Sequence, residues 1–223
     1  AIAKGVGAYG ATEDDSRLIN SFLGISADNK ANNNGDMVVT LGTDAAGAVT
    51  DAERIGGDAI ISAAQTMGDH KQSLVAIAMH SAIETRLERQ QLLKDYHDPN
   101  TGSLLYRTYL GYRVIIDDSM PAVSGAERIM YTVALFGVGV VGYATGNVNV
   151  PSELSRNPAA GDGGGEDILH SRVNTCFHPN GFKWKETNVA GQSPTYVELK
   201  DAANWERVVA RKSVNVAFLE VND

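Results

Sequence analysis

The sequence contains a single cysteine in 223 residues, no long apolar run and no cluster of basic residues. Because Cys176 has no second cysteine to pair with, an intramolecular disulfide is excluded, which fits a reducing compartment. A membrane-spanning helix needs about 20 consecutive apolar residues, whereas the best run, residues 133–141, is interrupted by Gly137 and Gly139. The N-terminus also lacks the basic and apolar regions of a signal peptide. We therefore expect neither a membrane protein nor a disulfide-stabilised secreted domain.

The charge balance is acidic, with 27 acidic residues against 19 basic ones and a formal net charge of -8. Proteins that grip duplex DNA present lysine and arginine to the phosphates, so the sign of the charge disfavours sequence-specific nucleic-acid binding. A protein can still enclose nucleic acid without binding it tightly. The hydrophobic content of 43% is enough for one substantial core or two modest ones.

The clearest local pattern is a helix, a strand and a second helix between Thr50 and about residue 93. Thr50 and Glu53 have the spacing of a capping box, and apolar residues at helical spacing follow them. Residues 74–79 (LVAIAM) form a short, continuously apolar run that predicts a strand buried on both faces. Ser81 and Glu84 repeat the capping-box spacing, with Ser81 as the expected cap of the second helix.

The flanking segments predict further helices and strands around this unit. The first residues form an amphipathic pattern that we expect to end in a turn at residues 28–36, DNKANNNGD, because asparagine and glycine favour turns. Residues 156–167 contain four glycines and are expected to form a flexible surface loop. Strands are expected at residues 37–41, 112–116 and 213–221, with two strands or one bulged strand at 128–143. The sequence therefore predicts an α+β protein with mixed sheets.

One motif formally matches a dinucleotide-binding loop, the GVGVVG of residues 137–142, with glycines at positions 137, 139 and 142. Such a site needs a strand, a glycine turn and a helix whose N-terminus meets the pyrophosphate. The following residues are β-branched or turn-forming and reach Pro151, so no helix is expected there. The pattern favours glycines in a closely packed β-hairpin and leaves a nucleotide-binding enzyme as the weaker alternative.

Other candidate residues also have simpler structural explanations. The adjacent Asp117 and Asp118 lie at the end of an expected strand and would point to opposite faces. His170, Cys176 and His178 offer possible metal ligands, but their spacing fits no zinc-binding pattern. We therefore predict no catalytic, cofactor-binding or metal-binding residues and no bound cofactor, and we expect that the protein is not an enzyme.

Several stretches, taken in order, resemble tailed-phage major capsid proteins with the Hong Kong 97-type fold. In that family a helix ending in Gly-Asp leads to an apolar strand, a Met-His-Ser or Met-His-Pro turn and another helix, as in residues 58–93 here. The resemblance continues along nearly the whole chain and is carried by DSRLINSFLGISADN (15–29), YLGYRVIIDDSMP (109–121), RIMYTVALFGVGVVGYATG (128–146) and KSVNVAFLEVN (212–222).

The resemblance implies an α+β Hong Kong 97-type fold with three parts. Residues 1–50 would hold the end of a spine helix and a peripheral strand, residues 51–145 an axial domain, and residues 146–223 the return to the peripheral domain. The implied function is a structural subunit that assembles with itself into the hexamers and pentamers of an icosahedral phage or prophage capsid enclosing DNA. The implied location is the virion, after assembly in the bacterial host cytoplasm, with scaffolding, portal or decoration proteins as further partners and no membrane partner.

The chain departs from this family at its beginning, where relatives place an N-terminal arm and an extended β-hairpin loop before the spine helix. Here the sequence starts inside the expected helix without an initiator methionine, which predicts a fragment or a processed chain. Two other functions remain open at this point. One is the shell of an encapsulin-like cellular compartment, and the other is a nucleotide-binding enzyme that uses residues 137–142.

Overall fold

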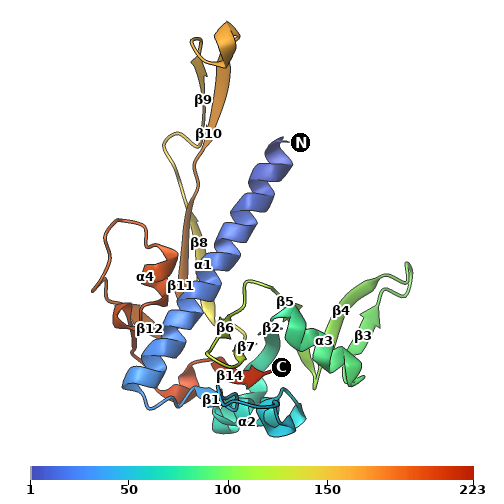
Figure 1. The fold of residues 1–223 in the computed structure, drawn as a ribbon. Helices are drawn as coiled ribbons and strands as arrows, with labels where there is room; N and C mark the ends of the chain where they lie inside the picture. Colours follow the sequence, from blue (N-terminus) through green and yellow to red (C-terminus); the bar gives the residue numbers. More distant parts are fainter. Residues whose placement is uncertain (1) are drawn as a thin grey trace. The chain divides into compact units, whose positions relative to one another are not determined.

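A computed structural model describes residues 2–223 of the chain (Figure 1). The chain forms two compact units. The first extends to Val140 and also includes Pro179–Asp223, whereas the second is the intervening segment Val141–His178. Helices and strands are both abundant in the first unit, so the expected α+β class is confirmed.

The centre of the first unit is a mixed eight-stranded sheet. Its strand order is β1-β14-β7-β2-β5-β4-β3, and β6 pairs with β7 beside this path. The pairs β1–β14 and β2–β5 are parallel, and the other pairs are antiparallel. The strands are β1 (Val38–Thr40), β2 (Leu74–Met79), β3 (Lys94–His97), β4 (Leu104–Tyr109), β5 (Tyr112–Ile116), β6 (Ala122–Ser124), β7 (Ile129–Gly137) and β14 (Val216–Asn222).

One face of this sheet packs against α2 (Gly57–Gln65) and α3 (Ser81–Arg89) and forms the main hydrophobic core. Two short 3-10 helices, Asp51–Glu53 and Gly68–Ser73, flank α2. Apolar side chains at helical spacing on the two helices meet alternate residues of the strands, as expected for helices lying on a sheet. The fully buried members include Ile60, Met67, Ile77, Met79, Ile83, Leu87, Leu135 and Leu219.

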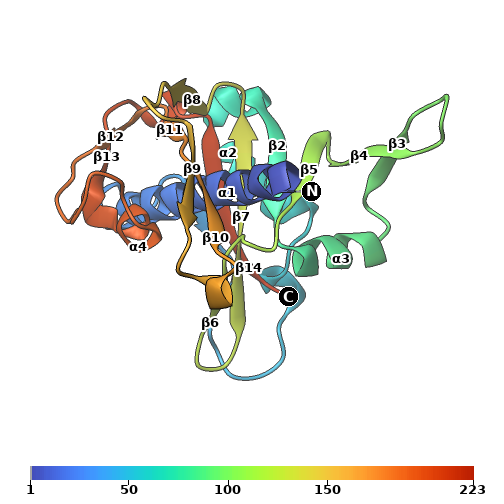
Figure 2. The ribbon, with the colours of Figure 1, turned by 90° about the horizontal axis from the view of Figure 1, so that it is seen from above.

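The opposite face is covered over β7 and β14 by the long helix α1 (Ile2–Asn32). Figure 2 shows α1 lying across these strands. Phe22 of α1 contacts two aromatic rings of the sheet, with ring centroids 5.0 Å from Phe136 and 6.4 Å from Phe218. Because β14 is covered on both faces, all seven of its residues are buried. The central strands therefore lie between two helical layers.

The C-terminal part of α1 also packs against a segment that precedes β14. This segment comprises β12 (Phe182–Trp184), α4 (Tyr196–Lys200), the 3-10 helix Ala202–Asn204, β13 (Trp205–Arg207) and the 3-10 helix Arg211–Ser213. The indole N–H of Trp205 donates a hydrogen bond to the Leu199 carbonyl at 2.8 Å, and its ring meets Trp184 edge-on at 4.8 Å. Gly24 of α1 lies against this corner, where a Cβ atom would come 2.1 Å from the Leu199 carbonyl oxygen. Glycine therefore allows the helix to approach this corner closely.

The second unit consists of two-stranded ribbons. Its strands are β8 (Val141–Gly146), β9 (Ser152–Asn157), β10 (Glu166–Ser171) and β11 (Asn174–Pro179), with a 3-10 turn at Gly161–Gly163. β9 pairs with β10 in antiparallel orientation, and β8 pairs with β11. The pairing of β9 with β10 is accompanied by two exposed ion pairs, Arg156–Asp167 at 3.1 Å and Arg172–Glu153 at 2.9 Å. Exposed pairs of this kind contribute little to stability, so the backbone hydrogen bonds are the main link between the two strands.

Several expected strands are confirmed. The run LVAIAM forms β2 with the predicted bounds, and β5 occupies residues 112–116 as expected. The predicted burial of LVAIAM on both faces is wrong, because Val75 is 46% exposed. The segment 128–143 does contain two strands, β7 and the start of β8. These strands were predictable because short β-branched or continuously apolar runs have few other stable conformations in a folded core.

Two other local predictions are wrong. The helix continues through Asn32, because Asn29 bonds both to the Asp36 carboxylate at 2.8 Å and to the backbone N–H of Met37 at 3.0 Å. These contacts stabilise a buried polar helix end that composition alone assigns to a turn. Residues 156–157 and 166–167 are strand residues, not part of a flexible loop, and only the intervening tip is glycine-rich.

Candidate functional site

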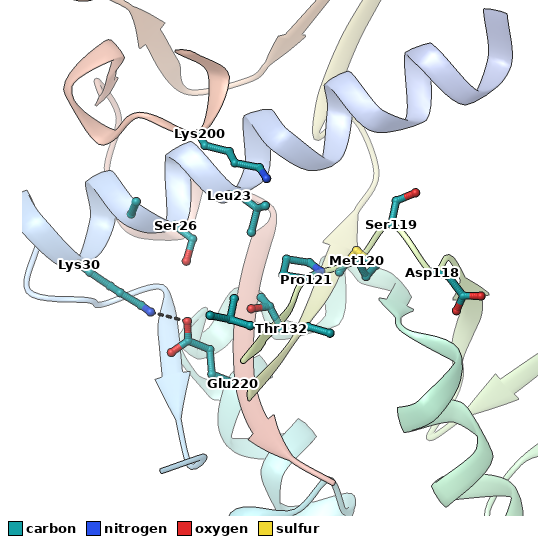
Figure 3. A pocket seen from close by; sticks show the side chains of 13 residues that line it. Leu23, Ser26, Lys30, Asp118, Ser119, Met120, Pro121, Thr132, Lys200 and Glu220 are labelled. Carbon is teal, nitrogen blue, oxygen red and sulfur yellow. Dashed lines mark hydrogen bonds and ion pairs between the residues drawn. The ribbon is translucent and has the colours of Figure 1, made fainter. Parts of the chain in front are cut away.

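A pocket of about 580 Å³ opens between α1 and the segment that leads through β6 to β7. Figure 3 shows side chains from α1, from β7 and β14 and from the loop before β6 around it. The lining residues are Leu23, Ser26, Ala27, Lys30, Asp118, Ser119, Met120, Pro121, Ala122, Val123, Thr132, Lys200 and Glu220. The pocket lies inside the first unit and mixes apolar and charged side chains.

Two of the charged residues that line this pocket are paired with each other. The Lys30 ammonium forms an ion pair with the Glu220 carboxylate (Figure 3). The second oxygen of Glu220 accepts a hydrogen bond from the Thr40 hydroxyl at 2.7 Å. Glu220 is buried, and these bonds offset the cost of removing its charge from water. The arrangement fastens α1 and β1 to β14 and provides no activated nucleophile or general base.

A second polar cluster is built around Arg128, at the start of β7. Its guanidinium donates to the Glu53 carboxylate at 2.8 Å and to the Gly47 and Ala48 carbonyls at 3.2 and 3.0 Å. The Arg128 side chain itself is 8% exposed, and its bond to Glu53 is partly buried. One side chain thus fastens the long loop between β1 and α2 to the start of β7.

Asp44 fixes the same loop from the other side. Its carboxylate accepts hydrogen bonds from the backbone N–H groups of Glu127, Ala126 and Arg128 at 3.0, 2.8 and 2.9 Å. These donors favour the ionised form and hold the pKa of Asp44 below its usual value. Gly125 is needed in the opposing turn, since a Cβ there would lie 2.2 Å from the Asp44 carboxylate.

The same cluster makes the stability of the protein sensitive to acid. Hydrogen bonds from the Thr43 hydroxyl, and then from the Thr50 backbone and hydroxyl, lower the pKa of Glu53 from 4.5 to about 2. Because the folded-state pKa is depressed, the ionised carboxylate stabilises the fold fully above about pH 4.5, and this contribution is lost as the pH falls toward 2. We expect Glu53→Gln to flatten the fall in melting temperature across this interval. If circular dichroism shows the same fall in melting temperature with decreasing pH for both proteins, this assignment is contradicted.

The glycine motif does not form a nucleotide site. β7 ends at Gly137, a turn follows with Gly139 at a φ of 72°, and β8 begins at Val141. A dinucleotide site would require a helix at this point, so the enzyme alternative is contradicted. Gly137 is closely packed as expected, with the position of a Cβ only 2.7 Å from the Ser73 carbonyl oxygen. The expected hairpin is wrong, because β7 pairs with β14, β2 and β6, whereas β8 pairs with β11.

The two aspartates at the end of β5 have structural partners. Asp117 accepts a hydrogen bond from the backbone N–H of Ser119 at 2.8 Å, and Asp118 accepts one from the backbone N–H of Ser81 at 3.2 Å. The prediction that Ser81 caps α3 is wrong. His80 is the cap, and its Nδ1 atom accepts from the Ala82 N–H at 3.1 Å, while Ser81 is bonded to Asp118.

The three possible metal ligands, His170, Cys176 and His178, lie in the second unit, Val141–His178, which we call the ribbon unit. His170 lies on β10 within 3.3 Å of the Ser155 hydroxyl, and Cys176 is exposed on β11, which also carries His178. Across residues 2–223, no group of three or more His, Cys, Asp or Glu side chains is arranged to hold a metal ion. Within the same range, no helix is both long and apolar enough to cross a membrane.

Comparison with known proteins then identifies the family. Residues 24–215 match the model of the major capsid protein 13-like family (Gp13-like). The chain belongs to this family. Over 160 residues it is 38% identical to the major capsid protein of Bacillus phage SPP1, an alignment that covers 71% of this chain. The predicted resemblance to tailed-phage major capsid proteins is therefore confirmed.

The matched part is shorter than the relative, because the alignment covers 48% of the SPP1 protein. A solved structure, the holo-SrpI encapsulin complex from Synechococcus elongatus PCC 7942, aligns with 78% of this chain and 52% of the encapsulin chain. Its sequence identity is 12% and its TM-score is 0.38. The Hong Kong 97-type fold class rests on membership of the capsid family together with the α+β architecture described above.

Proposed function

We propose that this chain is a structural subunit of a phage or prophage capsid, which assembles with copies of itself into hexamers and pentamers that enclose DNA. The observation that carries the proposal is the family match over residues 24–215, together with a 38% identical relative that is a major capsid protein. Shells built from many identical contacts can be stable even where each contact is weak.

The chemistry of the described residues supports a structural role without catalysis. Lys30 and Glu220 at the 580 Å³ pocket, and Arg128 with Glu53, are engaged in ion pairs, and Arg128 also donates backbone hydrogen bonds that fasten one element to another. A formal charge of -8 per chain is also consistent with a shell that encloses DNA without binding it tightly.

We further propose that the chain divides as its capsid relatives imply. Residues 1–50 would supply the spine helix and a peripheral strand, residues 51–145 the axial domain and residues 146–223 the peripheral return. In support, α1 and β1 belong to the first segment, β2 through β7 to the second, and β9 through β14 to the third, whereas β8 (Val141–Gly146) crosses the boundary between the second and third. Strands from all three segments meet in the eight-stranded sheet, so the segments would fold cooperatively.

The proposed location is the virion, after assembly in the cytoplasm of the bacterial host. Scaffolding, portal and decoration proteins are the further partners that such a shell would need. No observation favours the encapsulin-like alternative, in which the shell would hold a protein cargo in place of DNA. The two roles differ in what the shell contains.

The proposal is tested by producing the full-length protein in infected or induced host cells and isolating large particles on a density gradient. We expect fast-sedimenting particles that contain nuclease-protected DNA. Particles that contain a single enzyme and no DNA would support the compartment alternative, and a protein that remains in the slow fractions would contradict both shell functions.

A further inference from the structure

The outer part of the large sheet has one face that no described helix covers. Two rows of cross-strand neighbours lie on this face. The first row consists, in order, of Lys94, Thr108, Arg113 and Ala76. In the second row, Tyr96 pairs with Tyr106 and Ile115 pairs with Ala78, and extending the β4–β5 register by two residues places Tyr106 beside Ile115. We call the five exposed side chains Lys94, Tyr96, Tyr106, Arg113 and Ile115 the aromatic–cationic face.

This face is ordered but has no covering layer. The rings of Tyr96 and Tyr106 stack at 5.0 Å, and the Arg113 guanidinium lies over the Tyr106 ring at 5.5 Å. Tyr96, Tyr106 and Ile115 nevertheless remain 46%, 39% and 46% exposed. The helix α1 packs farther along the sheet, over Phe136 and Phe218, and in both views it stays clear of β3 and β4 (Figures 1 and 2).

An apolar groove of about 340 Å³ lies on the opposite side of the same sheet. Ile61 of α2 and Leu110 of the β4–β5 turn border it and are 53% and 52% exposed. Its lining is completed by Ala64, Lys71, Gln72, Leu74, Gly111 and Tyr112. Because Tyr112 and Leu74 belong to the side of the sheet that packs on α2, this groove and the aromatic–cationic face point in opposite directions.

The backbone conformation of Leu110, in addition to its exposure, indicates that the groove has a role beyond folding. It lies in the left-handed region with a φ of 50°, in a two-residue turn with Gly111 at a φ of 89°. Asparagine or aspartate is the usual residue before glycine in such a turn, and leucine is strained there. The chain therefore keeps an exposed apolar side chain at a position where a polar residue would fit the backbone better.

One charged residue beside the groove, Asp58, is opposite in sign to the aromatic–cationic face. Among the described residues, Lys94 and Arg113 form no ion pair, so the aromatic–cationic face carries two uncompensated positive charges. Asp58 lies on the exposed side of α2, three residues before Ile61, and likewise forms no ion pair among the described residues. Lys71 at the other end of the groove has the opposite sign, so a cationic partner would be directed toward the Asp58 end.

We propose that the groove and the aromatic–cationic face are the two halves of one head-to-tail contact between copies of this chain. Tyr106 and Ile115 of one copy would enter the groove beside Ile61 and Leu110 of the next, with Arg113 near Asp58. In a pair of copies, one copy would keep its groove free and the other its aromatic–cationic face, so the contact can repeat from copy to copy, and in the proposed capsid the repeat would close into the hexamer and pentamer rings. This inference rests on the proposed self-assembly and assigns the surfaces that carry it.

Thiol crosslinking of assembled particles tests the pairing. In a Cys176→Ser background, we combine Ile61→Cys with Tyr106→Cys and add a short bis-maleimide. A head-to-tail contact predicts a ladder of covalent oligomers that ends at closed rings, whereas each single-cysteine control gives no ladder. Particles whose products stop at dimers, or show no crosslinks, overturn the inference while leaving the shell function intact. Failure of the wild-type protein to form particles would instead contradict the shell function.

The Leu110→Asn variant provides an independent test that separates a role in assembly from a role in folding. Asparagine relieves the strained turn, so the melting temperature of the unassembled subunit should rise or stay unchanged. The same change removes an apolar contact from the groove and should raise the critical concentration for assembly by about tenfold. Assembly at the wild-type concentration overturns the inference, as does a loss of subunit stability that accounts for the assembly defect.

Discussion

Replacing Gly24 with valine should lower the free energy of unfolding by about 3 kcal/mol or more, because overpacking against rigid backbone is strongly destabilising. A Cβ atom at this position would lie 2.1 Å from the Leu199 carbonyl oxygen and 2.5 Å from the Trp205 indole nitrogen. Those two atoms are hydrogen-bonded to each other at 2.8 Å, so neither can move without breaking the bond. The helix would have to separate from the corner. Urea denaturation gives the change directly.

Gly10 provides a matched control in the same helix. No atom lies within 4 Å of a Cβ built at Gly10, which is solvent-exposed. Gly10→Val should therefore change stability by less than about 0.5 kcal/mol, because glycine and valine differ little in helix propensity. Comparable losses from both changes would mean that α1 is sensitive to any substitution, and the packing explanation for Gly24 would fail.

Phe218→Ala should lower the free energy of unfolding by about 3–5 kcal/mol, the range found when a buried phenylalanine is truncated. The Phe218 side chain is 1% exposed and lies on the central strand β14, where its ring meets Phe22 of α1 at 6.4 Å. The strand is hydrogen-bonded to β1 on one side and to β7 on the other. A cavity here would therefore weaken the contact between the helix and the sheet where three elements meet.

Two comparisons control this experiment. Phe218→Leu retains most of the apolar volume and should cost clearly less than the alanine variant. Val197, on α4, is 79% exposed, and Val197→Ala should change stability by less than about 0.5 kcal/mol. A loss below about 1 kcal/mol for Phe218→Ala would show that α1 does not form one cooperative unit with the sheet.

The helix–strand–helix unit was predictable because each of its signals is local. The continuously apolar β2 can be read directly from LVAIAM, and helical spacing of apolar residues marks α2. The cap of α3 was misassigned because its choice depends on Asp118, which is 37 residues away from Ser81. Local patterns identify the presence of an element more reliably than the bonds at its ends.

The polar clusters could not be predicted, because their members are far apart in the sequence. Arg128 is bonded to Glu53 across 75 residues, and Lys30 is paired with Glu220 across 190. Each of these residues looks like an ordinary surface charge when read alone. Gly24 did carry a usable signal, since a glycine inside a regular helix often marks a close approach of another segment.

The residues of the ribbon unit gave the weakest signals. All the β10 residues and all but one of the β9 residues are exposed, so the strands lack the alternation of apolar and polar residues that marks a half-buried strand. The ribbon is recognisable only from its register, which places Asn157 opposite Glu166 and Ser152 opposite Ser171. The glycine-rich residues between β9 and β10 led to the prediction of a single loop, so the ends of both strands were missed.

Cryo-electron microscopy of the full-length protein purified from host cells tests most directly whether this chain builds an icosahedral shell. The proposed function predicts closed particles with five- and six-membered rings, in which the eight-stranded sheet and α1 fit the density of each subunit. A monodisperse, folded monomer under all assembly conditions would contradict it.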